Sequence, residues 1–205
     1  MTTTVDPNAP SPFRLPPAPA DLRLETERLE LRLLEESDFE AMTVYRGDPE
    51  VCRFLPFPPQ SVDDIRGRIG RAIGSTSLEV EPGAVTVGIV RREDGLLIGD
   101  LVLFHLQPEH GTAEVGWVMR PDVAGRGYAT EAVRALLGAA FGVYGLRRIV
   151  ARIDAENTAS ARLAERLGMR LEAHLVENEW YKGRWGDELD YAILAREWAA
   201  GAPVA

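Results

Sequence analysis

The sequence has few of the residues that carry disulfide or metal chemistry. It contains one cysteine, Cys52, so no disulfide can form within the chain. No histidine stands beside Cys52, and we interpret it as a partly buried structural thiol rather than a nucleophile. The histidines are His105, His110 and His174, and no two of them lie four residues apart. A metal site of the zinc type is therefore not expected.

Long hydrophobic runs are also missing. The longest apolar stretch, residues 135–146, has twelve residues and includes three glycines. A helix that crosses a bilayer needs about 20 apolar residues, so this stretch is too short. The N-terminus has neither the basic segment nor the apolar segment of a secretory signal. We therefore expect a cytoplasmic protein with no membrane partner.

Positive charge is scarce relative to negative charge. The chain has 23 lysines and arginines against 32 aspartates and glutamates, which gives a formal charge of −9. An acidic surface repels nucleic acid and favours cationic partners, so nucleic acid is not an expected ligand. The 205 residues, 45% of them hydrophobic, are enough for one domain with a substantial core.

Proline is concentrated at the beginning of the chain. Six prolines fall within the first 20 residues, at positions 7, 10, 12, 16, 17 and 19. That density prevents a packed helix or strand, so we expect a disordered or extended arm over residues 1–20. The folded domain is then expected over residues 21–198, followed by a short tail at 199–205.

Hydrophobic periodicity predicts mixed α/β structure in the rest of the chain. Alternation over residues 28–33 is typical of a half-buried strand, and Ser61 precedes isoleucines at helical spacing. The turn at Asp94-Gly95 is typical of an antiparallel hairpin. In chain order we expect a strand (28–33), helices after Ser37 and Ser61, strands at 85–90, 96–104 and 112–119, a helix from 127 to about 144, a strand (148–154), a helix (158–167) and strands at 169–177 and 189–195.

The stretch between Pro121 and Glu131 carries the most chemistry. A strand is expected to end at Pro121, and Gly125-Arg126-Gly127 then leads into the N-terminus of a helix. Glycines let the backbone approach a ligand closely, and the N–H groups at a helix N-terminus attract anions. The loop is therefore predicted to bind a pyrophosphate.

Two other phosphate loops compete with this interpretation. A Walker A loop needs a lysine after its glycines, and none follows here. A dinucleotide-binding loop needs a small residue at position 130, which is Thr130, and a strand that runs directly into the first glycine. Asp154 ends the next predicted strand as a ribose-binding acid would, so dinucleotide binding stays an alternative.

Taken together, these residues resemble the GCN5-related N-acetyltransferase (GNAT) superfamily, specifically its RimJ/RimL-like branch, over about residues 22–198. Three segments carry the resemblance: the loop at 120–131, the helix at 157–169 and a C-terminal hairpin at 182–198. The chain departs from the family at Asp122, where the loop often has Gln or Arg. The resemblance implies an α/β fold with a mixed, mostly antiparallel seven-stranded sheet, split where acetyl-CoA enters, and about four helices.

The resemblance also implies which residues bind acetyl-CoA. Unpaired backbone groups near Val118 and Arg120 would pair with the pantetheine arm, and the loop amides would hold the pyrophosphate. The implied cofactor-binding residues are Val118, Met119, Arg120, Gly125, Arg126, Gly127, Tyr128, Ala129, Thr130, Asn157, Ser160 and Arg162.

Acetyl transfer needs a neutral amine, a stabilised acyl oxygen and a stabilised thiolate. By the same resemblance, Glu114 is the candidate base, and a strand-surface glutamate with a structural role is the alternative. The backbone N–H of Val118 is the candidate donor to the acyl oxygen. Ala164 stands where many relatives have a tyrosine acid, so Ser160, one helical turn from Asn157, is the candidate that stabilises the thiolate.

The predicted reaction is direct attack of a primary amine on acetyl-CoA in a ternary complex. The branch implies a protein N-terminal α-amine, whose pKa of about 8 leaves more of it neutral at pH 7 than of a lysine amine. A small-molecule acetyltransferase acting on an antibiotic or a polyamine is one alternative, and a non-catalytic acyl-CoA-binding module is another. Residues that could line the acceptor cleft are Phe54, Leu55, Phe57, Trp180, Tyr181 and Trp185, and the last three could instead form a homodimer contact.

Overall fold

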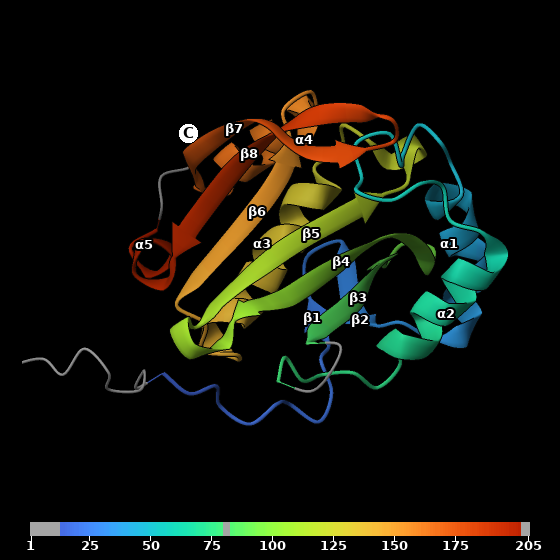
Figure 1. The fold of residues 1–205 in the computed structure, drawn as a ribbon. Coiled ribbons are helices and arrows are strands. Elements are labelled where there is room, and N and C mark those ends of the chain that lie inside the picture. The colour runs from blue at the N-terminus through green and yellow to red at the C-terminus, as the bar shows by residue number, and fades with distance from the viewer. Residues whose placement is uncertain (1–12, 80–82, 202–205) are drawn as a thin grey trace, which may run out of the picture.

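The computed structural model describes residues 13–79 and 83–201, and within them eight strands form a single mixed sheet (Figure 1). The strand order is β1-β2-β3-β4-β5-β6-β8-β7, and neighbouring strands are antiparallel except for β5 and β6. The strands are β1 (Leu24–Glu25), β2 (Leu29–Leu33), β3 (Ala84–Arg91), β4 (Leu96–Gln107), β5 (Thr112–Met119), β6 (Arg148–Asp154), β7 (Arg170–Tyr181) and β8 (Arg184–Leu194).

Helices begin where the sequence supplies caps. The Ser61 hydroxyl accepts a hydrogen bond from the Asp64 N–H at 3.2 Å, which starts α2 as predicted. The longest helix, α3, starts directly after Gly127. The α-helices in the described ranges are α1 (Phe39–Arg46), α2 (Val62–Ala72), α3 (Tyr128–Gly142), α4 (Thr158–Arg166) and α5 (Ala195–Ala199).

The predicted α/β class and the mostly antiparallel sheet are confirmed, with one strand and one helix more than the seven and four that we expected. The additional strand is β1, which pairs with β2 through only two residues, too few to give an alternating pattern in the sequence. The additional helix is α5. The Glu197 carboxylate accepts a hydrogen bond from the Leu194 N–H and so ends β8 at that residue.

The two faces of the sheet carry separate cores. On one face, α3 packs Leu136 and Leu137 against the strands. On the other face, α1 and α2 pack Met42 and Ile65 together with Val118 of β5. Figure 1 shows α1 and α2 together on their side of the sheet, at the ends of β4 and β5. Successive side chains of β5 therefore point into different layers of the molecule.

The predicted N-terminal arm is described only from residue 13 onward. Residues 13–23 contain no helix or strand, and Leu15 packs against the larger core. Pro16 lies close to Gly145, at the end of the α3 segment. Residues 1–12 and 202–205 lie outside the described residues, so the boundaries of the arm and the tail stay predictions.

Candidate active site

The sheet opens in its middle, between β5 and β6. These strands pair only from Thr112 with Arg148 to Glu114 with Val150, whereas β6 continues to pair with β8 as far as Asp154. Beyond Glu114 the edge of β5 has therefore separated from β6, which confirms the predicted split. A strand edge of this kind can bind an extended ligand through main-chain hydrogen bonds.

The backbone groups that face the opening are not all the ones we predicted. The Arg120 N–H donates to the Ile98 carbonyl of β4 at 2.9 Å, so it is not unpaired. Backbone groups of successive residues in a strand point to opposite sides, so those of Val118 also point to β4, and those of Trp117 and Met119 point to the opening. The structure thus corrects the assignment of Arg120 and Val118 as main-chain partners of the ligand.

The glycine loop has the geometry of an anion site. Gly125 and Gly127 have φ angles of 76° and 80°, in the left-handed region, and no atom lies within 4 Å of a Cβ built on Gly125. The N-terminus of α3 follows at once and points its N–H groups toward the same place. A cavity of about 330 Å³ adjoins the loop and is lined by Met119, Val123, Ala124, Gly125, Gly127, Tyr128, Ala129, Thr130 and Arg166.

The loop is held in place by Arg28, a residue that sequence reasoning missed. Its guanidinium donates to the Arg126 carbonyl at 2.9 Å and to the Glu131 carboxylate at 2.7 Å, and it lies over the Tyr128 ring. The Thr26 hydroxyl donates to the same carboxylate at 2.6 Å. These partners are about a hundred residues apart in the chain, so no local pattern could have revealed them.

Two arginines that we predicted to bind acetyl-CoA, Arg120 and Arg162, have side chains away from the loop cavity, whereas a third, Arg166, lies beside it. Arg120 forms an ion pair with Asp122 at 3.0 Å, which gives the residue that departs from the family pattern a structural partner. Arg162 is exposed and lines neither this loop cavity nor the second cavity, which lies at the opening of the sheet. Arg166, one helical turn further along α4, lines the loop cavity instead.

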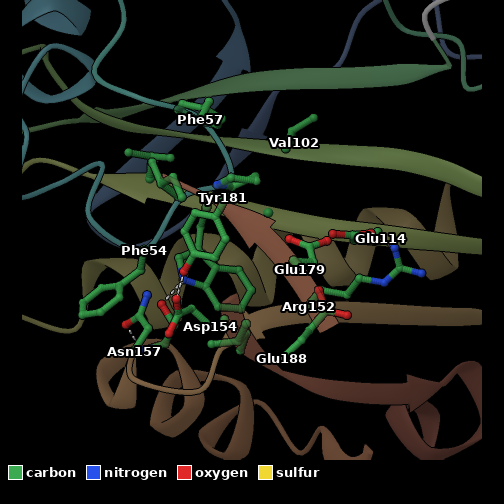
Figure 2. Close-up of a pocket in the computed structure, with 18 of the residues that line it drawn as sticks. Phe54, Phe57, Val102, Glu114, Arg152, Asp154, Asn157, Glu179, Tyr181 and Glu188 are labelled. Atoms are coloured by element: carbon green, nitrogen blue, oxygen red, sulfur yellow. Dashed lines mark hydrogen bonds and ion pairs between the residues drawn. The ribbon is translucent and has the colours of Figure 1, made fainter. Parts of the chain in front are cut away.

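A second cavity, of about 250 Å³, lies at the opening of the sheet (Figure 2). Its walls are the loop after α1, the facing strands β4 and β5, the end of β6, the start of α4 and the β7–β8 hairpin. The lining includes these predicted residues: Phe54, Leu55, Phe57, Glu114, Val118, Asn157, Ser160 and Tyr181. Trp180 and Trp185 are instead exposed, and their rings pack edge to face at 5.3 Å.

Glu114 lies in this cavity among other charged groups. Burial raises the pKa of its carboxyl above the ordinary value for glutamate, and Arg152, 3.8 Å away, lowers it. The nearby carboxylates of Asp190 and Glu179 raise the pKa further. Figure 2 shows Glu114, Glu179 and Arg152 together at one end of the cavity. A half-buried carboxylate with a raised pKa suits a general base.

Ser160 is held by two neighbours at the start of α4. The Trp117 indole N–H donates to its hydroxyl oxygen at 3.1 Å, and Asn157 caps the helix by accepting from the Ser160 N–H at 3.1 Å. Because the hydroxyl oxygen already accepts one hydrogen bond, its own hydrogen is free to donate. Ala164 is fully buried in the core, away from the cavity.

A polar cluster at the end of β6 was not predicted. The Tyr181 hydroxyl donates to the Asp154 carboxylate, and Arg184 binds both groups, at 3.2 Å and 3.1 Å. Asp154, the candidate ribose-binding acid of the dinucleotide alternative, is thus already bound within the protein. The cluster joins the β7–β8 hairpin to the open end of β6, and its residues Tyr181 and Asp154 line the same cavity as Phe54 and Phe57.

The hairpin turn also reaches the loop after α1. Lys182, the only lysine of the chain, donates from Nζ to the carbonyls of Cys52, Arg53 and Leu55, the last two at 3.1 and 2.8 Å. Cys52 is buried, its thiol contacts the Arg46 carbonyl at 3.3 Å, and burial raises the pKa of that thiol. These contacts agree with a structural thiol.

The fold and the site together define a class of protein. A mixed sheet that opens between two parallel strands, with a glycine loop at the start of the next helix and a buried carboxylate beside the opening, is the architecture of an acyl-CoA-dependent acyltransferase. The acetyltransferase (GNAT) domain family matches residues 28–170, and the chain belongs to this family. It is an acetyl-CoA-dependent N-acetyltransferase of the GNAT family.

Proteins with similar sequences and proteins with similar structures both support this family assignment. The uncharacterized N-acetyltransferase YnaD of Bacillus subtilis is 32% identical over 177 residues, covering 86% of this chain and 99% of that protein. A GNAT-family acetyltransferase from Bacillus anthracis is 32% identical and superimposes with a TM-score of 0.78 over 86% of this chain and 100% of that one. Spermidine N-acetyltransferase from Vibrio cholerae, solved with CoA and spermine, shares the fold at 23% identity with a TM-score of 0.74 over 85% of this chain and 99% of that one.

Within the described ranges, 13–79 and 83–201, none of the helices has the length and apolar character needed to cross a bilayer.

Proposed function

We propose that the chain acetylates the α-amine of an acceptor that enters the 250 Å³ cavity, with Glu114 as the general base. The observation that carries the proposal is the position of Glu114. It is the last residue of β5 that pairs with β6, and its half-buried carboxylate has a raised pKa. A base at the start of the opening can take a proton from an amine that attacks there.

The residues of the glycine loop and the β5 edge fit acetyl-CoA. Acetyl-CoA, when bound, supplies an activated acetyl group as a thioester. The N–H groups at Gly125 to Thr130 would hold its pyrophosphate, since the left-handed glycines leave room for a close approach and the helix N-terminus favours negative charge. The backbone groups of Trp117 and Met119 would bind the pantetheine arm as an added strand.

Three groups of this chain would then serve the transfer. The Glu114 carboxylate takes the proton from the amine. The Trp117 N–H, which replaces Val118 in this role, stabilises negative charge on the acyl oxygen. The Ser160 hydroxyl, fixed by the Trp117 indole at 3.1 Å, donates its hydrogen to the departing sulfur.

The acceptor is proposed from the chemistry of the base. A site with one carboxylate base and no tyrosine at position 164 suits an amine that is already partly neutral. An α-amine with a pKa of about 8 meets this condition better than a lysine amine with a pKa of about 10.4.

A polyamine is the second candidate. The carboxylates of Glu114, Glu179 and Glu188 line the cavity and could bind ammonium groups. A spermidine N(1)-acetyltransferase of Vibrio cholerae is among the relatives, at 24% identity over 168 residues.

One set of assays separates these functions. Amine-dependent release of thiol from acetyl-CoA is expected of an enzyme and not of an acyl-CoA-binding module. Short peptides with a free N-terminus should be acetylated faster than the same peptides with a blocked N-terminus and an internal lysine, as measured by mass spectrometry. Faster reaction of the internal lysine would refute the α-amine proposal, and turnover of spermidine alone would favour the polyamine.

A further inference from the structure

The acceptor cavity has a cationic end that the proposed reaction does not use. Two arginines, Arg46 of α1 and Arg68 of α2, line it at this end and share a single carboxylate, Asp100 of β4. The Asp100 side chain has no solvent exposure, and the Tyr45 hydroxyl also donates to it, at 2.9 Å. Two guanidinium groups against one carboxylate leave one positive charge in the wall.

The two arginines differ in how well they are paired. Arg46 donates to Asp100 from Nε at 2.9 Å and from Nη2 at 2.5 Å, and from Nη1 to Gln60 at 3.2 Å. To the residues that the structure describes, Arg68 donates only from Nη2, at 3.2 Å. Its Nε is buried and has no hydrogen-bond partner among the described residues. Arg46 is therefore a structural ion pair, whereas Arg68 has unused donors at the cavity.

A partly buried guanidinium that shares its carboxylate with a second arginine is costly, and the protein retains it. Burial lowers the pKa of Arg68, and the repulsion from Arg46 adds to this effect against the attraction of Asp100. Buried charges are usually neutralised by an opposite charge with good hydrogen bonds. A planar donor with free N–H groups on a cavity wall matches a carboxylate in particular, because the two can form a bidentate pair.

The register of the sheet fixes where this end lies relative to the base. Asp100 is opposite Val118, Val102 is opposite Gly116, and Phe104 is opposite Glu114. Four residues of a strand span about 14 Å, so the cationic end and the Glu114 end lie about that far apart along β5. Val102 and Gly116 form a floor without polar side chains between the two ends.

We propose that the cavity binds an acceptor that carries a carboxylate as well as its primary amine, with the carboxylate on Arg68 and the amine toward Glu114. This assignment rests on the proposed acetyl transfer and names its substrate class. The carboxylate belongs to an acidic residue near a peptide N-terminus, because the amine and the carboxylate of a free amino acid share one carbon and cannot reach both ends of the cavity. A polyamine, which has only cationic groups, would be repelled at the Arg68 end.

Matched acceptor pairs test the assignment. We would measure amine-dependent thiol release for amidated tripeptides that carry aspartate or asparagine at the second or third position. With the wild-type protein, the carboxylate member of a pair should have a KM about tenfold or more below that of its amide, since hydrogen bonds to charged groups contribute on that scale. The position that shows the preference identifies where the carboxylate stands in the acceptor peptide.

The variant Arg68→Gln should raise the KM of the carboxylate acceptor about tenfold and leave the KM of its amide and both kcat values nearly unchanged. Arg71→Gln, an exposed arginine of the same helix, is the matched control and should change none of these values. Arg68→Lys keeps the charge without the planar fork and should give an intermediate loss. Circular dichroism checks the fold, which the Arg46–Asp100 pair should preserve.

A binding measurement keeps this inference separate from the proposed function. The carboxylate acceptor should raise the melting temperature of the wild-type protein more than its amide does, and Arg68→Gln should remove that difference even without acetyl-CoA. Absence of turnover on every amine, with this difference present, would refute the acetyl transfer but not the carboxylate site. Equal KM values within every pair, or a rise in both KM values in Arg68→Gln, would overturn the carboxylate site itself.

Discussion

The acidity of Glu114 is set by its neighbours. An exposed strand glutamate ionises near pH 4.3 and is a weak base. Here the side chain is only 20% exposed, and burial with two nearby carboxylates raises its pKa while Arg152 limits the rise. The acid limb of the kcat/KM profile should therefore lie above the ordinary glutamate value, because activity is lost as Glu114 gains a proton on falling pH.

The substitution Glu114→Gln keeps the shape and removes the basicity. We expect kcat near neutral pH to fall by about 100- to 10,000-fold, the range typical of a positioned base, with acetyl-CoA binding kept. Raising the pH should restore part of the activity, since more of the amine is then neutral in solution. Thiol release measured from pH 6 to 9.5 checks both points. A variant that matches the wild type at pH 7 would make Glu114 structural.

The sequence was sufficient to place Glu114, Asn157 and Ser160 at the cavity, because each belongs to a recognisable segment. It was not sufficient to choose the backbone donors. Alternation of side chains tells which face of a sheet a residue occupies, but the direction of its N–H depends on the hydrogen-bond register with the neighbouring strand. That register, with the Arg120 N–H on Ile98, turns Val118 away from the opening.

At the scale of single elements, local signals predicted the starts of α2 and α3 but not the buried face of α1. The apolar Val44 of that helix is 49% exposed. The buried side instead carries Tyr45 and Arg46, whose polar groups meet Asp100. Hydrophobic periodicity cannot show this, because the ion pair joins residues 54 positions apart.

The glycine loop before α3 should be required for acetyl-CoA binding. Gly127→Val forces a branched residue into a left-handed conformation at the anion site, and it should abolish the rise in melting temperature caused by acetyl-CoA. Gly74→Val is the matched control, because Gly74 is also left-handed, with φ of 71°, and has open space around it. Both variants should lose about 1–2 kcal/mol of stability from backbone strain, and only Gly127→Val should lose the ligand response. A retained response would remove the loop from the acetyl-CoA site.

The hairpin of β7 and β8 is tied to the loop after α1 by a single ammonium group. Lys182→Met removes the donor shared by three carbonyls and should lower the unfolding free energy by about 1 kcal/mol, as measured by urea denaturation. It should also raise the KM of the acceptor, because Phe54 and Leu55 line the cavity. Lys182→Arg keeps the charge and should recover part of the stability. Equal stability in all three proteins would mean that the tether contributes nothing.

For the molecule as a whole, the opening between β5 and β6 divides the sheet into two halves. The half before the opening has cores on both faces, whereas β7 at the other edge is largely exposed. The pairing at Thr112 to Glu114 and the hydrogen bonds of Lys182 join the two halves. Acetyl-CoA bound along the β5 edge would add another contact, so its binding should stabilise the whole fold rather than one loop.

Hydrogen exchange can show which backbone N–H groups of β5 face the opening and which face β4. Saturating acetyl-CoA should slow hydrogen exchange most at the Trp117 and Met119 amides, which face the opening. Gly116 and Val118, whose groups already point to β4, should slow only as far as the stability of the whole fold rises. At an acetyl-CoA concentration about 100 times its Kd, the free energy of unfolding should rise by about 2.7 kcal/mol. Amide exchange followed residue by residue by NMR gives the measurement, with NAD as the control ligand that should have no effect. Slowing confined to Gly116 and Val118 would show that the register argument is wrong. Equal slowing at both pairs, with the melting temperature raised, would place acetyl-CoA away from the strand edge altogether.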